Sequence, residues 1–455
     1  MSDAHEWDAL LDYTAGKAKA YLDGVDERPV PPAVATDDLV ADFDLPADGL
    51  DAKSVIEQLC RNAEPGLTAM ASPRFFGFVI GGVYPVALAA DWLTSTWDQN
   101  AGLRDVTPAH SAAREGVERW LVDLLGLPAG TTMGTVTGGL MANFTGLAAG
   151  RHAVLARAGW DVAEQGLQGA PRVRVLVGAE RHDTIDLALR YLGLGAPELV
   201  AADDQGRIRV DALAEALDEG PTIVALQAGN VHSGAFDDFA AAIPLAHEHG
   251  AWVHVDGAFG LWAAASPRTR HLTAGFEQAD SWATDAHKTL NVPYDSGLAF
   301  VADSTVHRAT MGIHAPYLIQ SQGAPDPLEL GPEFSQRGRA FVLWATLRHL
   351  GVRGVAGLVD GLVENAQALA EGVRQIGGEV LNEVVFTQIC TAWADDATTL
   401  AVEQQLLASG RAWMTGSVWQ GRRVLRIAVS NQATDEQSVQ QSLAALEQAY
   451  RAVRS

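Results

Sequence analysis

From about residue 75 to residue 305, short apolar runs alternate with segments whose apolar residues recur at helical spacing. The apolar runs are continuous rather than alternating, which is typical of strands in a sheet that is covered on both faces. Helical patterns such as "DTIDLALRYLG" and "FAAAIPLAHEHG" separate them. This order predicts an α/β unit with a mostly parallel sheet, and its predicted strands are 173–179, 222–229, 251–258, 281–286 and 297–303.

The pattern differs on both sides of this region. "EWDALLDYTAGKAKAYLDGV" predicts an amphipathic helix within the first 30 residues, and "RPVPPAV" ends it. After residue 345, a helical run, two strand-like runs and a closing helix indicate a smaller α+β unit. We therefore predict an N-terminal helical extension at 1–75, a large α/β domain at 76–345 and a small C-terminal α+β domain at 346–455.

The segment 312–336 is rich in glycine, proline and polar residues, which predicts a long loop. Loops of this length in compact domains are often functional.

Composition narrows the class of protein. The chain has 455 residues, of which 48% are hydrophobic and 19% charged, as in a folded protein of enzyme size. A net charge of −24 argues against nucleic acid or an anionic membrane as a partner. No apolar run has the length of a membrane span, and the N-terminus does not resemble a signal peptide. Two cysteines, without a CxxC or HExxH motif, favour a cytoplasmic protein without a metal site.

Lysine is rare in this chain. Lysine and arginine together number 32, but only four are lysines, and Lys288 is the single lysine after residue 53. A surface cation can be either residue, whereas a nucleophilic amine cannot be arginine, which stays protonated. Lys288 is therefore a candidate for covalent chemistry. On composition alone, chance retention in an arginine-rich chain explains it equally well.

Two further features lie at predicted strand ends. Asp256 ends "AWVHVD", and Gly257 and Ala258 follow it and leave room for a flat group. The segment 135–151, "TVTGGLMANFTGLAAGR", passes from a strand through Gly-Gly into a helix, which offers backbone N–H groups and a positive dipole end to a phosphate. A lysine amine, a buried acid and an anion site are what pyridoxal phosphate requires. Each signal is weak alone, but together they favour this cofactor.

With these motifs, the sequence resembles the group II pyridoxal-phosphate-dependent amino-acid decarboxylases, which include aromatic-L-amino-acid decarboxylase and glutamate decarboxylase. The resemblance is strongest at "GNVHSGAFDDF", "HVDGAFG" and "DAHK". It implies fold type I of the pyridoxal-phosphate-dependent transferases, with a mostly parallel seven-stranded sheet. It also implies a homodimer with its sites at the subunit interface and decarboxylation of an L-amino acid to the amine and carbon dioxide.

The resemblance also implies roles for individual residues. Lys288 forms the imine with the cofactor, Asp256 pairs with the ring nitrogen, and His182 stacks on the ring. Tyr317, in the predicted loop, protonates the substrate carbon after carbon dioxide leaves. The further cofactor contacts implied in this way are Thr137, Gly138, Gly139, Leu140, Asn230, Ala258, Asp285 and His287.

The chain departs from the family pattern in three places. Its phosphate loop reads "GGLMAN", with Leu140 and Met141 where relatives have threonine and glutamate, so we expect backbone N–H groups to replace a hydroxyl. Gln336 stands where relatives often have arginine, although Arg337 and Arg339 are close by. Arg426 lies where fold-related aminotransferases bind a substrate carboxylate, but a surface or packing role is an alternative.

Substrate choice is less well determined. Five aromatic residues lie in segments that line the substrate pocket of relatives, namely Phe75, Phe76, Phe78, Trp92 and Trp97. They favour an aromatic or bulky apolar amino acid, although core packing explains them equally well.

Two other reactions with the same cofactor stay open. Pro293 resembles the pattern of sphingosine-phosphate-lyase-like enzymes, which break a carbon–carbon bond by retro-aldol cleavage. A decarboxylating aldehyde synthase is the second alternative, and Tyr317 counts against it. An acidic binding protein on an enzyme fold is the non-enzymatic alternative.

Overall fold

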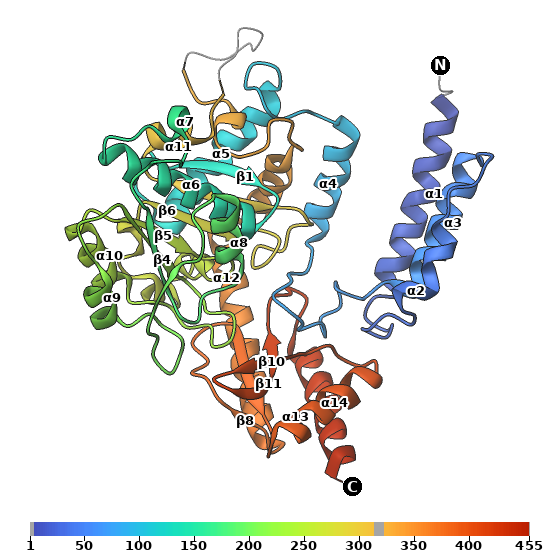
Figure 1. The fold of residues 1–455 in the computed structure, drawn as a ribbon. Coiled ribbons are helices and arrows are strands. Elements are labelled where there is room, and N and C mark those ends of the chain that lie inside the picture. Colours follow the sequence, from blue (N-terminus) through green and yellow to red (C-terminus); the bar gives the residue numbers. More distant parts are fainter. Residues whose placement is uncertain (1–3, 314–322, 455) are drawn as a thin grey trace.

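The computed structural model describes residues 4–313 and 323–454. It consists of a large α/β part, a smaller α+β part and an N-terminal arm of helices (Figure 1).

The large part is built on a sheet that has seven strands within the described residues. These are Thr132–Val136 (β1), Arg174–Gly178 (β2), Glu198–Val200 (β3), Thr222–Gln227 (β4), Trp252–Asp256 (β5), Ser281–Asp285 (β6) and Gly297–Val301 (β7). The strand order is β1-β7-β6-β5-β4-β2-β3, and all neighbours from β6 to β3 are parallel. β7 is antiparallel to both β1 and β6. The predicted fold class and all five predicted strands are therefore confirmed, whereas the three-residue β3 was not predicted.

Helices cover both faces of this sheet (Figure 1). Alternate strand residues belong to two apolar cores, because successive side chains of a strand point to opposite faces. Val175 and Val177 pack with the helices α6 and α8, whereas Leu176 packs on the other face with α5, α10 and α12. The helices of the large part are Pro85–Trp97 (α4), Pro108–Leu125 (α5), Gly139–Arg157 (α6), Val162–Gln165 (α7), Thr184–Tyr191 (α8), Val210–Ala216 (α9), Phe239–Glu248 (α10), Ser304–Met311 (α11) and Arg339–Gln375 (α12).

α12 connects the large part to the small part. It is interrupted at Gly351, whose φ of 60° is in the left-handed region that glycine adopts without strain. Residues before the break pack in the core of the large part. Residues after it pack against both cores, with Val359 in that of the large part and Leu369 in that of the small part. The helical run that we predicted after residue 345 corresponds to this second half.

The small part has an antiparallel sheet in the order β10-β11-β9-β8. Its strands are Glu379–Val380 (β8), Gln388–Ala392 (β9), Thr415–Trp419 (β10) and Arg422–Ala428 (β11), and its helices are Asp396–Ala408 (α13) and Glu436–Arg454 (α14). β9, β11 and α14 agree with the prediction. β10 was missed because most of its residues are only partly buried, so it lacks an apolar run.

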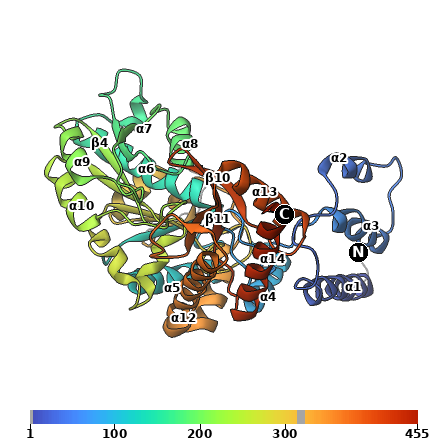
Figure 2. The ribbon, with the colours of Figure 1, turned by 90° about the horizontal axis from the view of Figure 1, so that it is seen from below.

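The N-terminal arm contains Ala4–Asp23 (α1), Thr36–Leu39 (α2) and Ala52–Ala63 (α3). Figures 1 and 2 show α1 and α3 side by side, standing away from the rest of the chain. Apolar side chains of both helices face solvent, including Leu11 and Leu59, which are 54% and 51% exposed. Across residues 4–313 and 323–454, we find no helix that is long and apolar enough to span a membrane.

Gly134, in the middle of β1, gives a test of the packing of the large part. A Cβ atom at this position would overlap the backbone oxygen of Leu330. We predict that Gly134→Ala lowers the free energy of unfolding by about 3 kcal/mol, because backbone cannot move aside as a flexible side chain can. Chemical denaturation would measure the change.

Gly361→Ala is the matched control for this substitution. Gly361 lies in α12, and no atom of the described residues lies within 4 Å of the added Cβ. The control is expected to raise stability by up to about 1 kcal/mol, because alanine is the better helix former. Wild-type stability of Gly134→Ala would contradict the packing described here.

Candidate active site

Polar residues gather at the carboxyl ends of the parallel strands. Asp256 is the last residue of β5 and Asp285 the last residue of β6. These two strands pair in parallel, with Asp256 opposite Ala283, so their ends lie side by side. His182 follows β2, and Lys288 follows β6 by three residues. Ligands of open α/β sheets bind at this edge.

Lys288 and His287 both approach the carboxylate of Asp285. Lys288 Nζ lies 2.9 Å from Asp285 Oδ2, and His287 Nε2 lies 3.4 Å from Asp285 Oδ1. The side chain of Asp285 is almost completely buried, whereas that of Lys288 is 22% exposed. The lysine amine is therefore held at the site and is still accessible.

The glycine pair at the start of α6 faces the same group. A Cβ atom at Gly138 would lie 3.2 Å from His287 Cε1, and one at Gly139 would lie 2.8 Å from Asp285 Oδ2. The first N–H groups of a helix lack partners within the helix, and no side chain in the described ranges caps this one. The turn therefore offers backbone donors, with the positive end of the helix dipole behind them.

Leu140 and Met141, which replace the expected polar residues, pack away from these donors. Leu140 contacts the apolar core under α6 and α8, and Met141 contacts the small cluster around Val136 and Ala283. Only the backbone of this turn is left to bind an anion, as the sequence led us to expect. Thr137, directly before the glycine pair, is exposed.

Asp285 is the one group that does not suit an anion site. Its Oδ1 atom is buried and has no hydrogen-bond partner among residues 4–313 and 323–454. The backbone of the glycine turn fits a phosphate, but the nearby carboxylate repels one.

His287 is held as a neutral hydrogen-bond donor. The backbone N–H of Ser296 donates to His287 Nδ1 at 3.0 Å, so the ring proton is on Nε2. Burial is the main cause that lowers the pKa of His287, and Lys288 adds to it. The ring stacks on Tyr294 with centroids 4.2 Å apart. The Nε2–H group therefore points toward Gly138 and Asp285.

Asp256 is a buried acid with few donors around it. Its side chain accepts a hydrogen bond from the backbone N–H of Ala258 at 3.2 Å. Burial raises the pKa of Asp256, whereas the neighbouring His182 and Lys288 and a hydrogen bond from Asn143 oppose that shift. A cationic ring nitrogen is the kind of partner that such a carboxylate lacks.

Gly257 does not have the role that we expected. A Cβ atom there would lie 2.8 Å from Leu261 Cβ and 3.2 Å from the backbone oxygen of Ala283. The glycine is therefore required by packing below the site and not by space for a flat group above it.

His182 is a further member of the group around Asp256 and Lys288. Its Nδ1 atom accepts a hydrogen bond from the backbone N–H of Thr184 at 3.2 Å, which places the ring proton on Nε2. Burial lowers the pKa of His182, while its charged neighbours Asp256 and Lys288 act in opposite directions. A small cavity next to this ring is lined by His182, Asp256 and Gly178, among others.

Asn230 is placed differently from the expectation. Its side-chain NH₂ donates to the oxygens of Glu180 and Gln227, and its Oδ1 accepts from the backbone N–H groups of His232 and Ser233. All four positions are used within neighbouring loops, so the geometry favours a role in shaping the loop over a contact with a cofactor.

The expected aromatic wall is mostly absent. Phe75 and Phe76 are 2% and 1% exposed and belong to the interior, where Phe75 packs on Trp413. Trp97 lines a groove on the outside of the large part. Phe78 remains as a candidate for the wall, since it is 53% exposed and its backbone oxygen accepts a hydrogen bond from Arg426. Trp92, on α4, is 43% exposed.

The boundary between the large and small parts has residues that the sequence did not single out. His232 Nε2 lies 3.0 Å from Ser417 Oγ on β10, and the ring stacks on Trp419. Burial lowers the pKa of His232 to about 4, and Arg426 and His182 contribute in the same direction. His232 therefore lies close to His182, at the boundary between the two sheets. A histidine just after a strand end, within "GNVHSG", was the available signal.

The remaining expected residues are accounted for as follows. Gln336 holds the preceding turn through Pro327 and Glu333, Arg337 pairs with Asp91, and Arg339 pairs with Asp295. Tyr317 lies outside the described residues.

Comparison with known proteins adds to this geometry. The family model described as the pyridoxal-dependent decarboxylase conserved domain matches residues 37–393. The chain is 27% identical over 426 residues to an aromatic-L-amino-acid decarboxylase of Bacillus atrophaeus, covering 87% of this chain and 85% of that protein. It is 28% identical over 363 residues to a cysteine sulfinic acid decarboxylase of Homo sapiens, covering 77% and 72% of the two chains.

A solved structure, that of Oryza sativa TDC with PLP and tryptamine, matches with a TM-score of 0.93 at 23% identity. The match covers 100% of this chain and 99% of that one. At this identity, the likeness supports the fold.

Asp285→Asn tests whether the carboxylate faces the bound phosphate. We expect pyridoxal phosphate to bind about fivefold to tenfold more tightly to the variant, because removing one like charge beside an anion is worth about 1 kcal/mol. The difference should shrink with added salt. Absorbance titration of the cofactor-free protein would measure the dissociation constant.

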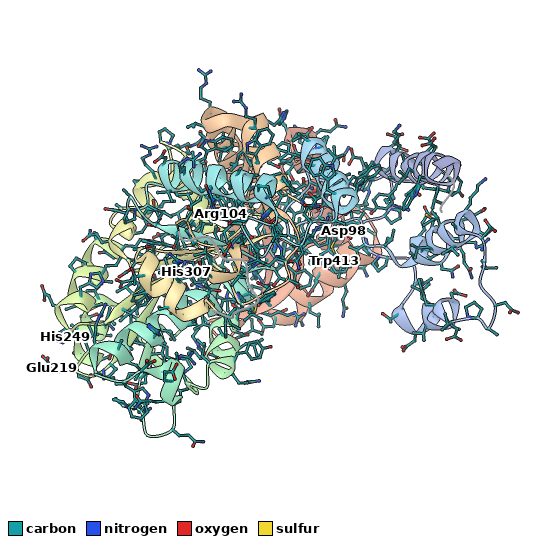
Figure 3. All side chains as sticks on the ribbon, turned by 90° about the horizontal axis from the view of Figure 1, so that it is seen from above. Asp98, Arg104, Glu219, His249, His307 and Trp413 are labelled. Atoms are coloured by element: carbon teal, nitrogen blue, oxygen red, sulfur yellow. The ribbon has the colours of Figure 1, made fainter. Side chains whose placement is uncertain are left out.

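Glu219→Gln is the control for net charge in this titration. Glu219 is exposed and precedes β4, at the opposite edge of the sheet from the site (Figure 3). It should leave binding unchanged. If Asp285→Asn binds no more tightly than the wild type, the carboxylate does not face the phosphate.

Proposed function

This chain belongs to the family of pyridoxal-dependent decarboxylases, and we propose that Lys288, Asp256 and His182 form the centre of its active site. The family match spans residues 37–393. It confirms the predicted family, cofactor and enzyme class, a pyridoxal-phosphate-dependent carboxy-lyase that acts on amino acids.

One observation carries the proposed site. Three groups lie at one edge of the sheet: the amine of Lys288, the buried carboxylate of Asp256 and the uncapped start of α6. The cofactor, when bound, supplies an aldehyde that condenses with amines and a ring that takes up the electrons of the broken bond. The backbone N–H groups of Gly139 and Leu140, with His287 Nε2–H, would hold its phosphate, and Asp256 would hold its ring nitrogen.

Each of the central residues then has a task that its surroundings suit. Lys288 would hold the aldehyde through its amine, which lies next to Asp285. Asp256, with few donors around it, would hold the protonated ring nitrogen through a charge-assisted hydrogen bond. His182, whose ring is fixed by Thr184, would support the flat ring from one side.

Tyr317 is proposed to return a proton to the substrate carbon. This assignment rests on the family resemblance and on its place in the segment after Lys288, because the residue is outside the described part of the chain.

The substrate is proposed to be an L-amino acid with an aromatic or bulky apolar side chain. Phe78 supports this choice, as does the likeness to the Bacillus atrophaeus enzyme. An acidic amino acid is a second candidate because of Arg426. Within residues 4–313 and 323–454 this arginine pairs with no carboxylate, and its buried Nε has no hydrogen-bond partner.

Borohydride reduction tests the role of Lys288. Protein incubated with pyridoxal phosphate and then reduced should carry the cofactor on Lys288, which peptide mass spectrometry would locate. Lys288→Arg keeps the positive charge but cannot form the covalent bond, so label and turnover should both be lost. Lys53→Arg, at an exposed position of α3, is the control and should retain both. Label on another lysine would refute the assignment.

The products of an amino-acid panel separate the reactions that share this cofactor. We expect amine and carbon dioxide in equal amounts. Aldehyde without carbon dioxide would instead indicate retro-aldol cleavage, and aldehyde with carbon dioxide and peroxide would indicate an aldehyde synthase. Comparing aromatic with acidic amino acids in the same panel decides between the two substrate classes.

The active unit is proposed to be a homodimer in the cytoplasm. An apolar groove of about 450 Å³ opens between α4, α5 and α12, lined by Leu93, Trp97, Phe341 and Trp344 among others. Apolar residues of α1 and α3 face solvent on an arm that stands away from the rest of the chain (Figure 2). They offer an apolar surface that is complementary to this groove. A second copy of the chain would cover both. The cytoplasmic location is supported by the free thiols of Cys60 and Cys390.

Leu93→Glu tests the dimer. Leu93 lines the groove and is 48% exposed, so a charge there would be buried without a partner in a dimer. We expect the wild type to sediment as a dimer and the variant to dissociate at micromolar concentration. Leu199→Glu, at a 57% exposed position of the edge strand β3, is the matched control and should stay dimeric. Equal behaviour of the two variants would place the interface elsewhere.

A further inference from the structure

β5 presents three large polar or aromatic side chains to α6. Trp252, His254 and Asp256 are alternate residues of the strand and therefore share one face. The facing residues of α6 occur in reverse order, since the helix runs back from the site. A Cβ atom at Gly150 would lie 2.7 Å from Trp252 Cδ1, and one at Gly146 would lie 2.5 Å from His254 Nδ1. The two glycines make the room that these rings occupy.

Asn143 is the next residue along this face of α6, one turn nearer to the site, and it connects the rings to Asp256. Trp252 Nε1 lies 3.0 Å from Ser281 Oγ, and Ser281 Oγ lies 2.9 Å from His254 Nδ1. His254 Nε2 lies 2.9 Å from Asn143 Oδ1. The side chain of Asn143 in turn faces Asp256 and lowers the pKa of that carboxyl. Four side chains thus form a continuous chain of hydrogen bonds that ends beside Asp256.

The chemistry of these groups sets the direction of every bond. The indole N–H can only donate, so Ser281 Oγ accepts from Trp252 and its own hydroxyl proton is free for His254 Nδ1. The proton of the neutral imidazole is then on Nε2, which donates to Asn143 Oδ1. The amide of Asn143 is therefore oriented with its NH₂ toward Asp256. All donors point along the chain to the carboxylate.

The chain of bonds is sealed from water. His254 and Ser281 are 0% exposed, and Asn143 is 1% exposed. Burial lowers the pKa of His254 to about 3, so the imidazole stays neutral and the direction of the bonds holds across the physiological range. Buried polar groups of this kind are costly unless each finds a partner. Here each of them does.

We propose that Asn143 and His254 are positioning residues for the cofactor, acting through Asp256. His254 fixes the amide of Asn143, and Asn143 holds the carboxylate ionised and aimed at the ring nitrogen. The inference rests on the proposed function, because it takes Asp256 as the partner of that nitrogen. Trp252 and Ser281 set the tautomer of His254 from the far end.

Two ligands separate this role from general support of the fold. Pyridoxal phosphate has the ring nitrogen, whereas its 1-carba analogue has a CH group in that place and cannot bond to Asp256. The ratio of their dissociation constants, measured by titration of the cofactor-free protein, reports the Asp256 contact alone. It needs no measurement of turnover.

Three substitutions interrupt or preserve the chain of bonds. Asn143→Leu keeps the branched shape and the number of heavy atoms and removes the donor to Asp256. His254→Asn keeps an acceptor for Ser281 but loses the donor to Asn143, because its amide reaches only the Nδ1 position. His254→Gln reaches the Nε2 position and keeps that donor. The two histidine variants carry the same amide group, differ in length by one methylene, and differ in the bond to Asn143.

We expect Asn143→Leu and His254→Asn to weaken pyridoxal phosphate binding by about tenfold, the size of one lost hydrogen bond to a charged group. Binding of the 1-carba analogue should stay near the wild-type value, and His254→Gln should resemble the wild type for both ligands. His307→Asn is the control, since His307 on α11 (Figure 3) is an equally buried histidine bonded to Thr132 and Leu330. It should leave the ratio unchanged.

Equal weakening for both ligands in the variants would overturn the inference, because it would indicate damage to the fold. An unchanged ratio, or His254→Gln behaving as His254→Asn, would overturn it as well. If the wild type itself binds both ligands equally, the assignment of Asp256 under the proposed function fails and this inference fails with it. A wild type that discriminates, with variants that discriminate as strongly, refutes this inference alone.

Discussion

A carboxylate buried at the end of β5 is the constraint on which the rest of the site depends. Taking an ionised group out of water costs several kcal/mol unless donors and opposite charges compensate. Asp256 receives one backbone N–H, the Asn143 amide and the nearby Lys288 and His182. This supply remains incomplete, since burial still raises the pKa of Asp256. A partner with a cationic ring nitrogen would supply the missing compensation for the buried charge. The burial of Asp256 is therefore explained only when a cofactor is considered with it.

α6 meets two demands of this site because it runs antiparallel to β5. Its first turn, at Gly138 and Gly139, brings uncapped N–H groups to the edge of the sheet. Its side carries Asn143 and Gly146 along the strand, where they contact Asp256 and His254. The glycines therefore serve close approach, as a larger residue would push the helix off the sheet and move its uncapped N–H groups with it. In the proposed site, one rigid unit would hold both the phosphate and the ring nitrogen.

Much of this arrangement could be predicted from the sequence, where local pattern decides the outcome. Continuous apolar runs locate the buried strands, and the scarcity of lysine singles out Lys288. Local pattern does not decide which face a residue meets. Phe75 and Phe76 have the composition of a pocket wall but are in the core, and Gly257 opens toward Leu261 instead of the site. In the sequence, His254 is simply one residue of an apolar strand. Its proposed role depends on Asn143, which lies more than 100 positions earlier in the chain.

The proposed site is divided between the large part and the small part. This division would separate cofactor binding from the choice of substrate. The groups proposed to hold the cofactor all belong to the large part, on strands and on the helix that packs against them. Ser417 and Arg426 come from the small part, and across the boundary they bond to His232 and to Phe78, respectively. The small part is carried on the second half of α12, beyond the break at Gly351. Substitutions at the boundary can therefore change the choice of substrate while the hydrogen bonds around Asp256 stay intact, because the two sets of contacts have no residue in common.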